Sequence, residues 1–179
     1  MGAFDSWNTN NLWIGLIGLL LFFNSCYSDQ EIKETERVNH DQFSHLLQII
    51  IDPNGLVDYS ILIKEKGKLN DYLNQLSQHH PGLNWSQNEI KAYWINAYNA
   101  FTLKLIIENY PLKSIKDLNP GISVPFINSI WDREFIDISG LKYSLNDIEH
   151  NKLRDKFADP RIHFALNCAS KSCPVLLNK

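Results

Sequence analysis

Cysteine, histidine and carboxylate side chains in the last third of the chain are the residues best suited to nucleophilic chemistry. Cys168 stands where a segment of alternating apolar and polar residues gives way to small and polar ones, a place where nucleophiles are commonly displayed. His150, on a separate helix, would act as the base, with Glu149 orienting its ring. Asn96 or Asn99 would supply an amide that polarises the bond under attack. Together these residue types predict a cysteine-dependent hydrolase of peptide or amide bonds.

The spacing of Cys168 and Cys173 leaves other interpretations open. In an oxidising compartment, two cysteines this close in sequence can form a disulfide that clamps a short loop. With His150 and His163 they also supply four zinc-type donors, but no closely spaced pair such as C-x2-C anchors a metal site. We therefore predict neither a metal nor another cofactor. In the remaining interpretation, Cys168 is a small buried thiol without a chemical role.

The amino-terminal residues resemble an export signal. An uninterrupted apolar run, LWIGLIGLLLFF, covers residues 12–23. A membrane-spanning helix needs about 20 apolar residues, whereas the core of a secretory signal needs only about 7–15. The run is followed at residues 23–26 by FNSC, which resembles the lipobox of bacterial lipoproteins. In those proteins the cysteine becomes the acylated first residue of the mature chain, and two or more acyl chains make a stable anchor.

We therefore predict a signal peptide over residues 1–25 and lipidation of Cys26. The protein would be lipid-anchored in, or secreted into, the bacterial cell envelope, with the membrane as a partner through its lipid. The residues before the apolar run contain Asp5 and no Lys or Arg. That departure from the usual positive region leaves an uncleaved hydrophobic anchor as the alternative.

Composition favours one globular domain after this signal. The 179 residues include 17 Lys+Arg and 20 Asp+Glu, give a net charge of -3, and are 44% apolar. These values exclude disorder, collagen-like sequence and a disulfide-dense miniprotein, and the length fits a single domain of about 100–150 residues. The basic residues are scattered, so nucleic acid is not predicted as a partner. Residues 26–38 are polar without periodicity and predict a tether, followed by a domain over residues 39–179.

Apolar spacing predicts helices in the first half of this domain. One helix ends near residue 51 at a turn of Asp, Pro, Asn and Gly, and a second spans residues 61–78. A capping box over residues 86–89 opens the longest helix, which runs to about residue 109. Apolar residues cover most of its faces, so we expect it to be central.

Two asparagines, Asn96 and Asn99, fall within the covered faces of this central helix. A buried amide without partners costs about 1–3 kcal/mol, so both amides must be hydrogen-bonded. They would fix a loop, cap a neighbouring helix or contact a substrate.

The second half of the domain contains strand patterns. Residues 131–138 and 141–143 predict a β-hairpin, and a capping box over residues 144–147 opens a helix to about residue 154. Residues 161–167 alternate apolar and polar side chains, which predicts a strand. Helices first and strands later favour an α+β domain, with a helical amino-terminal half packed on a small antiparallel sheet.

Three blocks of sequence carry a family resemblance. They are KAYWINAYNA at residues 91–100, SLNDIEH at 144–150 with Arg154, and DPRIHFALNC at 159–168 with SCP at 172–174. In this order they resemble the domain of unknown function 547 family over roughly residues 84–179. The activity of that family is not established, and many members are secreted or lipid-anchored bacterial proteins. Family domains continue past the Cys-Pro segment, which implies a domain that is incomplete at its carboxyl end.

The sequence thus predicts an exported, lipid-anchored α+β domain that hydrolyses an envelope peptide or similar amide through Cys168. The first alternative is a non-catalytic module that binds an envelope ligand or peptide. The second is an inactive, truncated fragment.

Overall fold

The computed structural model describes residues 35–119, 129–169 and 173–176. The predicted signal peptide, Cys26 and the predicted tether as far as residue 34 lie outside these described residues. The elements, in chain order, are α1 (Asp41–Ile50), α2 (Tyr59–Lys64), α3 (Lys66–Gln78), α4 (Gln87–Glu108), η1 (Ile115–Leu118), η2 (Ile130–Asp132), β1 (Ile136–Ile138), β2 (Leu141–Tyr143), η3 (Asp147–Arg154), α5 (Asp155–Phe157) and α6 (Ile162–Ala165).

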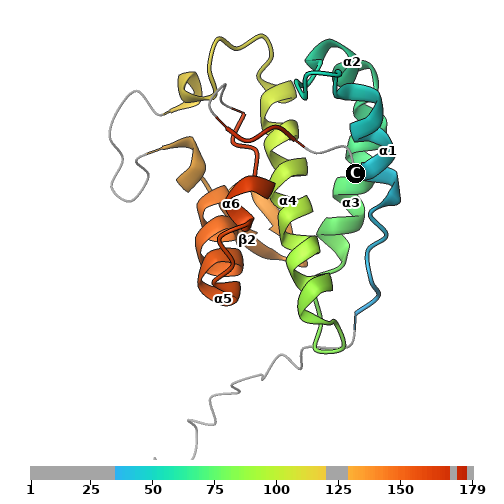
Figure 1. Ribbon diagram of the computed structural model, residues 1–179, viewed down its shortest axis with the longest axis vertical. Coiled ribbons are helices and arrows are strands. Elements are labelled where there is room, and N and C mark those ends of the chain that lie inside the picture. Colours follow the sequence, from blue (N-terminus) through green and yellow to red (C-terminus); the bar gives the residue numbers. More distant parts are fainter. Residues whose placement is uncertain (1–34, 120–128, 170–172, 177–179) are drawn as a thin grey trace, which may run out of the picture. The chain divides into compact units, whose positions relative to one another are not determined.

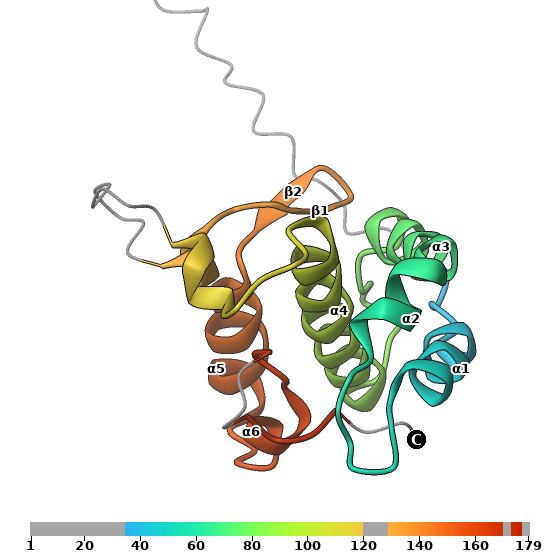
Figure 2. The same ribbon diagram turned by 90° about the horizontal axis from the view of Figure 1, so that it is seen from above.

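The first three helices form one flank of the domain (Figures 1 and 2). α1 ends where its periodicity predicts, at the turn that begins with Asp52. The helix expected over residues 61–78 is instead two helices, α2 and α3, which meet at Glu65. α2 begins before residue 61 because the carboxylate of Asp58 accepts hydrogen bonds from the backbone N–H groups of Ser60 (2.9 Å) and Ile61 (3.1 Å).

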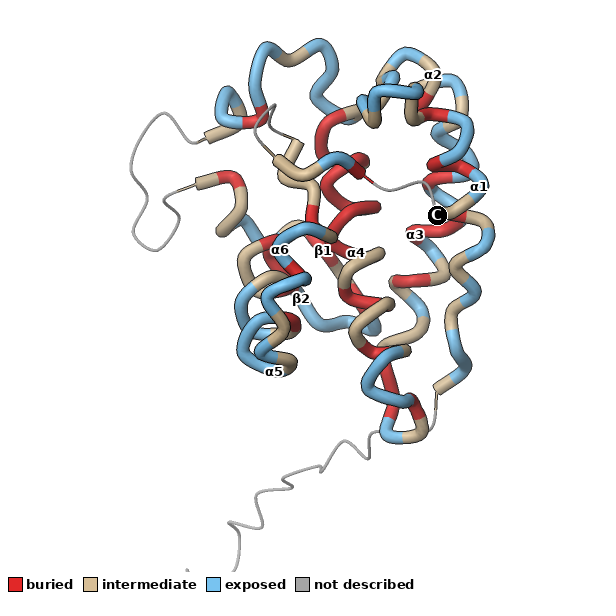
Figure 3. Tube along the Cα trace, viewed as in Figure 1, coloured by how far each residue is buried: buried red, intermediate tan, exposed pale blue. Residues whose placement is uncertain are grey.

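α4 is the central helix, as predicted. It begins at the expected capping box, in which the Ser86 hydroxyl accepts from the Glu89 N–H (3.3 Å) and the Glu89 carboxylate accepts from the Ser86 N–H (2.7 Å). Figure 2 shows α4 between α1–α3 on one side and α5 and α6 on the other. Buried residues follow α4 over most of its length in Figure 3. Side chains on opposite faces of α4 can therefore be held by different layers of the fold.

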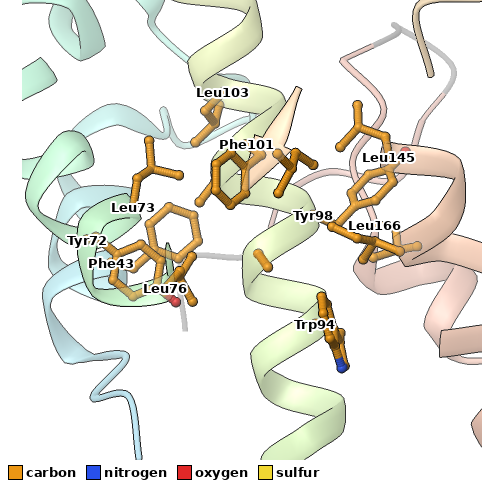
Figure 4. Close-up of a cluster of buried hydrophobic side chains, with 14 of the residues drawn as sticks. Phe43, Tyr72, Leu73, Leu76, Trp94, Tyr98, Phe101, Leu103, Leu145 and Leu166 are labelled. Carbon is orange, nitrogen blue, oxygen red and sulfur yellow. The ribbon is translucent and has the colours of Figure 1, made fainter. Parts of the chain in front are cut away.

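The hydrophobic core has one part on each side of α4 (Figure 4). On one side, Phe43 of α1 stacks on Tyr72 of α3, with ring centroids 4.7 Å apart. On the other side, Tyr98 of α4 lies with Leu145 and Leu166, all of them buried. Burying a large apolar side chain contributes about 1.5–3 kcal/mol, so α4 is stabilised from both sides.

The predicted antiparallel hairpin forms, and β2 has the expected bounds. Its first strand is shorter than the predicted 131–138, because η2 occupies residues 130–132 and β1 begins only at Ile136. Ile136 pairs with Tyr143 and Ile138 with Leu141, so the buried Ile136 and Ile138 share the inner face. After β2, Ser144 and Asp147 form the expected reciprocal hydrogen bonds at the start of η3. The expected helix to residue 154 forms, with π-helical hydrogen bonding. Helices on a small antiparallel sheet confirm the α+β class.

His80 joins the helical flank to the hairpin. Its Nε2 lies 3.2 Å from the hydroxyl of Tyr143, and its ring meets Trp94 edge-on at a centroid distance of 5.6 Å. Burial lowers the pKa of His80, and the positive charges of Lys152 and Lys156 lower it further. The folded protein therefore favours the neutral ring.

The strand predicted over residues 161–167 is wrong, because this segment contains the short helix α6. Ile162 and Leu166 are buried at 2% and 6% exposure, whereas Phe164 between them is 67% exposed. Apolar residues four apart fit the period of a helix as well as a multiple of the strand period. A strand with Ile162 and Leu166 on its buried face would also bury Phe164. In α6, Phe164 is instead exposed to solvent.

Among the described residues, no helix is both long and apolar enough to cross a membrane.

Candidate functional site

The two carboxy-terminal cysteines are joined. A disulfide links Cys168 to Cys173 across a Cα–Cα distance of 6.1 Å, and both residues are half-buried. We call the described residues around it, 166–169 and 173–176, the cysteine segment. While this bond stands, neither sulfur is a thiol that can ionise and act as a nucleophile.

A buried amide of the central helix holds this segment in place. The Asn99 side chain, only 4% exposed, donates through Nδ2 to the Ala165 carbonyl (2.9 Å) and accepts through Oδ1 from the Asn167 N–H (2.9 Å). The Asn99 amide thus makes one hydrogen bond to the backbone before Leu166 and one to the backbone after it. Asn99 fixes a segment of chain, which is one of the roles that the sequence left open for it.

Asn167 ties the two arms of the cysteine segment to each other. Its Nδ2 donates to the Pro174 carbonyl (2.9 Å), and its Oδ1 accepts from the Ala169 N–H (2.9 Å). Ala169 has a φ of 55°, in the left-handed region that non-glycine residues rarely adopt. Hydrogen bonds and a covalent bond therefore both hold the conformation around Cys168.

A cleft of about 270 Å³ opens beside the disulfide. One wall is the cysteine segment, and the other is the loop between α1 and α2 together with the first residue of α2. Cys173 lines the cleft, whereas Cys168 is not among its described lining residues. The lining residues are Gly55, Leu56, Val57, Tyr59, Asn167, Ala169, Cys173 and Val175.

The two walls approach closely at Gly55. A Cβ placed on Gly55 would lie 2.9 Å from the Cβ of Val175, and the φ of Gly55 is +81°, so glycine is required here for both reasons. Asp52 shapes the same turn, because its carboxylate accepts from the N–H groups of Asn54 (2.9 Å) and Leu56 (2.8 Å). These hydrogen bonds, led by the one from Leu56, hold the pKa of Asp52 below its ordinary value.

A second hollow of about 460 Å³ adjoins the loop wall. It shares Leu56, Val57 and Tyr59 with the cleft and adds Tyr110, whose ring centroid is 6.3 Å from that of Tyr59. The side of the domain at the α1–α2 loop is therefore hollowed over more than the cleft itself. In Figure 2 this loop and the cysteine segment lie next to each other.

The model of the family described as "Protein of unknown function, DUF547" matches residues 83–177. The chain belongs to the DUF547 family. No curated protein and no solved structure matches the chain.

The DUF547 match includes only one wall of the cleft. Asn99, Asn167 and both cysteines fall within residues 83–177, and so does Val175. The loop wall, at residues 55–59, precedes the match. The anchored disulfide therefore lies in the family region, while the surface facing it comes from the preceding helices.

The candidate catalytic residues Glu149 and His150 both lie on η3. Glu149 accepts two hydrogen bonds from the Arg154 guanidinium, from Nε at 2.9 Å and Nη2 at 2.7 Å. His150 is exposed. Within the described parts of the chain, the structure gives no hydrogen bond between His150 and either Glu149 or Cys168. Glu149 is engaged by arginine, not by the neighbouring imidazole.

Glu149 and Arg154 belong to a polar cluster that sequence reasoning missed. Tyr98, which is 1% exposed, interacts electrostatically with Glu149, and Arg154 Nη2 lies 3.3 Å from Nδ1 of His163. Burial raises the pKa of Tyr98 well above its ordinary value, and the charge of Glu149 adds to the rise. Arg154 follows Glu149 by five residues, which is not the usual spacing of helical ion pairs, so this contact was hard to predict from the sequence.

Two other candidate residues, Asn96 and Cys26, are not among the described residues that form the site at the cleft. Asn96 is half-buried on α4, and the described residues give its side chain no hydrogen-bond partner. The expectation that both amides are hydrogen-bonded is therefore confirmed for Asn99 and wrong for Asn96, whose side chain is not fully removed from solvent. Cys26, the predicted lipidation site, lies outside the described residues. No group of three or more His, Cys, Asp or Glu side chains suited to a metal ion occurs within the described ranges.

Proposed function

We propose that this DUF547 protein is a lipid-anchored binding module of the bacterial cell envelope. Its ligand site is the cleft between the cysteine segment and the α1–α2 loop. The observation that carries the proposal is the disulfide beside the cleft. A bonded Cys168 has no nucleophilic thiolate, whereas a binding surface gains from a wall that does not move.

The rigidity of that wall supports binding. Asn99 joins the cysteine segment to the core of the domain, and Asn167 joins its two arms. A wall that is fixed before the ligand arrives loses little conformational entropy on binding, so more of the contact energy appears as affinity.

The chemistry of the lining favours a peptide or a similar amide. Leu56 and Val175 offer apolar surface, and both are more than two-fifths exposed, at 61% and 49%. Asn167 and Tyr59 add an amide and a hydroxyl at the same cleft. Ligand sites commonly combine apolar walls with a few polar groups, and a short peptide presents both kinds of surface.

Peptide titration followed by nuclear magnetic resonance tests the proposal. The probes are acetylated and amidated tripeptides with an apolar central residue and no cysteine, added to the oxidised protein. We expect saturable shifts of the amide signals of Val57, Tyr59, Asn167 and Val175. Leu56→Asp should abolish them, and the control Leu141→Asp, at a 47% exposed position on β2, should not. Saturable shifts confined to another face, or no shifts with any probe, would reject the cleft as the ligand site.

A cysteine-dependent hydrolase is the second candidate function. The observation in its favour is that Asn99 and Asn167 hold Cys168 in a fixed segment beside a cleft. Hydrolysis would require reduction of the disulfide, after which Cys168 would carry a free thiol.

This second function has its own test. The reduced protein should cleave one of the same tripeptides, and Cys168→Ala should abolish cleavage while Cys173→Ala retains it. His150→Ala and Glu149→Gln should each lower kcat by about 10²-fold if these residues serve as base and orienting group. Cleavage that survives Cys168→Ala would exclude this mechanism.

A further inference from the structure

The disulfide presents one of its two cysteines to the cleft. Cys173 lines the cleft, and Cys168 does not. A thiol–disulfide exchange begins when a thiolate reaches one of the two sulfur atoms, so access decides which sulfur is attacked. A thiol-bearing molecule seated in the cleft would meet Cys173.

The conformation of the cysteine segment does not depend on the disulfide alone. Asn167 bonds to the Pro174 carbonyl on the Cys173 side and to Asn99 on the Cys168 side. Cleaving the S–S bond leaves these hydrogen bonds in place. Exchange at this disulfide therefore needs no unfolding of the segment.

We propose that the cleft captures thiol-bearing ligands covalently at Cys173. This inference rests on the proposed binding function, and it means that some ligands of the cleft carry a thiol. The ligand thiolate forms a bond with Sγ of Cys173, the bond from that sulfur to Cys168 breaks, and Cys168 leaves as a thiolate. Cys168 then takes the proton that the ligand thiol gave up, so that one disulfide and one thiol become a mixed disulfide and one thiol.

The same geometry makes the capture reversible. The hydrogen bonds of Asn99 and Asn167 hold Cys168 close to Cys173 after exchange, within a segment where their Cα atoms are 6.1 Å apart. The Cys168 thiolate can attack the mixed disulfide, restore the original bond and release the ligand thiol. One S–S bond forms and one S–S bond breaks in this step, so no external oxidant or reductant is consumed.

Peptide mapping by mass spectrometry locates the adduct. The full-length protein with Cys26→Ser is incubated with reduced glutathione, acid-quenched and treated with N-ethylmaleimide. Because Lys171 separates the two cysteines in the sequence, trypsin places them on different peptides. We expect glutathione on Cys173 and maleimide on Cys168, with at least about a tenfold preference over the opposite pattern. An equal distribution, a preference for Cys168, or a reaction that occurs only in denaturant would overturn the inference.

A pair of matched variants tests whether the cleft guides the thiol. Leu56→Trp narrows the cleft and should slow adduct formation by about tenfold, whereas Leu141→Trp, on β2, should react at the wild-type rate. Equal rates for both variants, with unchanged melting temperatures, would contradict capture in the cleft. The tripeptide titration uses thiol-free probes, so failed capture with retained peptide binding would reject this inference and leave the binding function standing.

Discussion

The amide of Asn99 determines how the cysteine segment lies against α4. Its two hydrogen bonds are made to backbone groups of Ala165 and Asn167, so they hold the chain regardless of the side chains that follow. A buried backbone group that loses its partner costs about 1–3 kcal/mol. The segment that bears Cys168 is therefore linked to the stability of the core.

Replacing Asn99 should destabilise the domain. We expect Asn99→Ala to lower the free energy of unfolding by about 2–4 kcal/mol, because two partly buried backbone groups lose the amide that pairs with them. Asn96→Ala, on the same helix, should change it by no more than about 0.5 kcal/mol. Urea denaturation followed by circular dichroism measures both values. Equal losses for the two variants would show that Asn99 has no special role.

The half-buried ring of His80 makes the free energy of unfolding depend on pH. Its pKa in the folded protein lies below the ordinary value of 6.5, so between these two values the unfolded chain binds more protons. Stability should therefore fall as the pH drops below about 6.5. His40, whose pKa is also lowered by burial, contributes in the same direction.

The variant His80→Phe should show a weaker dependence. Its melting temperature should fall less than that of the wild type between pH 7.5 and pH 5.5, because one titrating group has been removed and His40 remains. Differential scanning calorimetry at a series of pH values measures the effect. Parallel curves for the two proteins would contradict the assignment to His80.

Residue types alone could not reveal which contacts form at the site. The sequence allowed Cys168 to be a bonded cysteine, a nucleophile, a metal ligand or a buried thiol, and only the three-dimensional placement of Cys173 separates these roles. It also paired Glu149 with the adjacent His150, although consecutive helical residues point in different directions. The structure instead directs Glu149 toward Arg154.

At the scale of elements, local signals predicted α4 best. Its capping box and its apolar faces both act within one stretch of chain, so they can be read from the sequence. α6 could not be identified in this way, because Ile162 and Leu166 fit two periods. The division between α2 and α3 at Glu65 also lacked a Pro or Gly signal at that residue.

The cleft itself could not be predicted, since its walls come from segments far apart in the sequence. The turn over residues 52–55 is evident from its residue types, but its contact with Val175 is a tertiary contact that the sequence does not reveal. Packing of the two walls requires a glycine at position 55, and that requirement can be measured.

Three glycine substitutions separate the two reasons for glycine at position 55, which are its positive φ and its close approach to Val175. Gly140→Ala should cost about 1–2 kcal/mol through its φ of +81° alone, because no atom lies within 4 Å of the added Cβ. Gly55→Ala has the same φ and should cost at least about 1 kcal/mol more through contact with Val175. Gly67→Ala, in open space on α3, should stabilise by about 0.5–1 kcal/mol. Chemical denaturation gives the ranking, and equal costs at positions 55 and 140 would contradict the close approach of the walls.

The proposed protein as a whole is a binding domain attached to a membrane anchor. The domain begins after residues that lie outside the described parts of the chain, and the lipobox-like FNSC at residues 23–26 is the feature that favours anchoring. Two or more acyl chains on one residue provide stable membrane attachment. The cleft would then act at the surface of the envelope membrane.

Metabolic labelling tests the anchor. Radiolabelled palmitate should enter the wild-type protein in a bacterial host and should be lost completely in Cys26→Ala. Ser25→Ala, which keeps a small residue before the cysteine, should still be labelled. Undiminished label in the Cys26 variant would rule out lipidation at this residue.

The bond between Cys168 and Cys173 is the feature on which the proposed binding function depends most. Alkylation of the natively purified protein with iodoacetamide near neutral pH, without reductant, followed by peptide mapping, tests it directly. We predict that both cysteines remain unlabelled and appear as a disulfide-linked peptide pair, and that both become labelled once a reductant has been added. Rapid labelling of Cys168 before reduction would contradict the disulfide and would make the cysteine hydrolase the better-supported function.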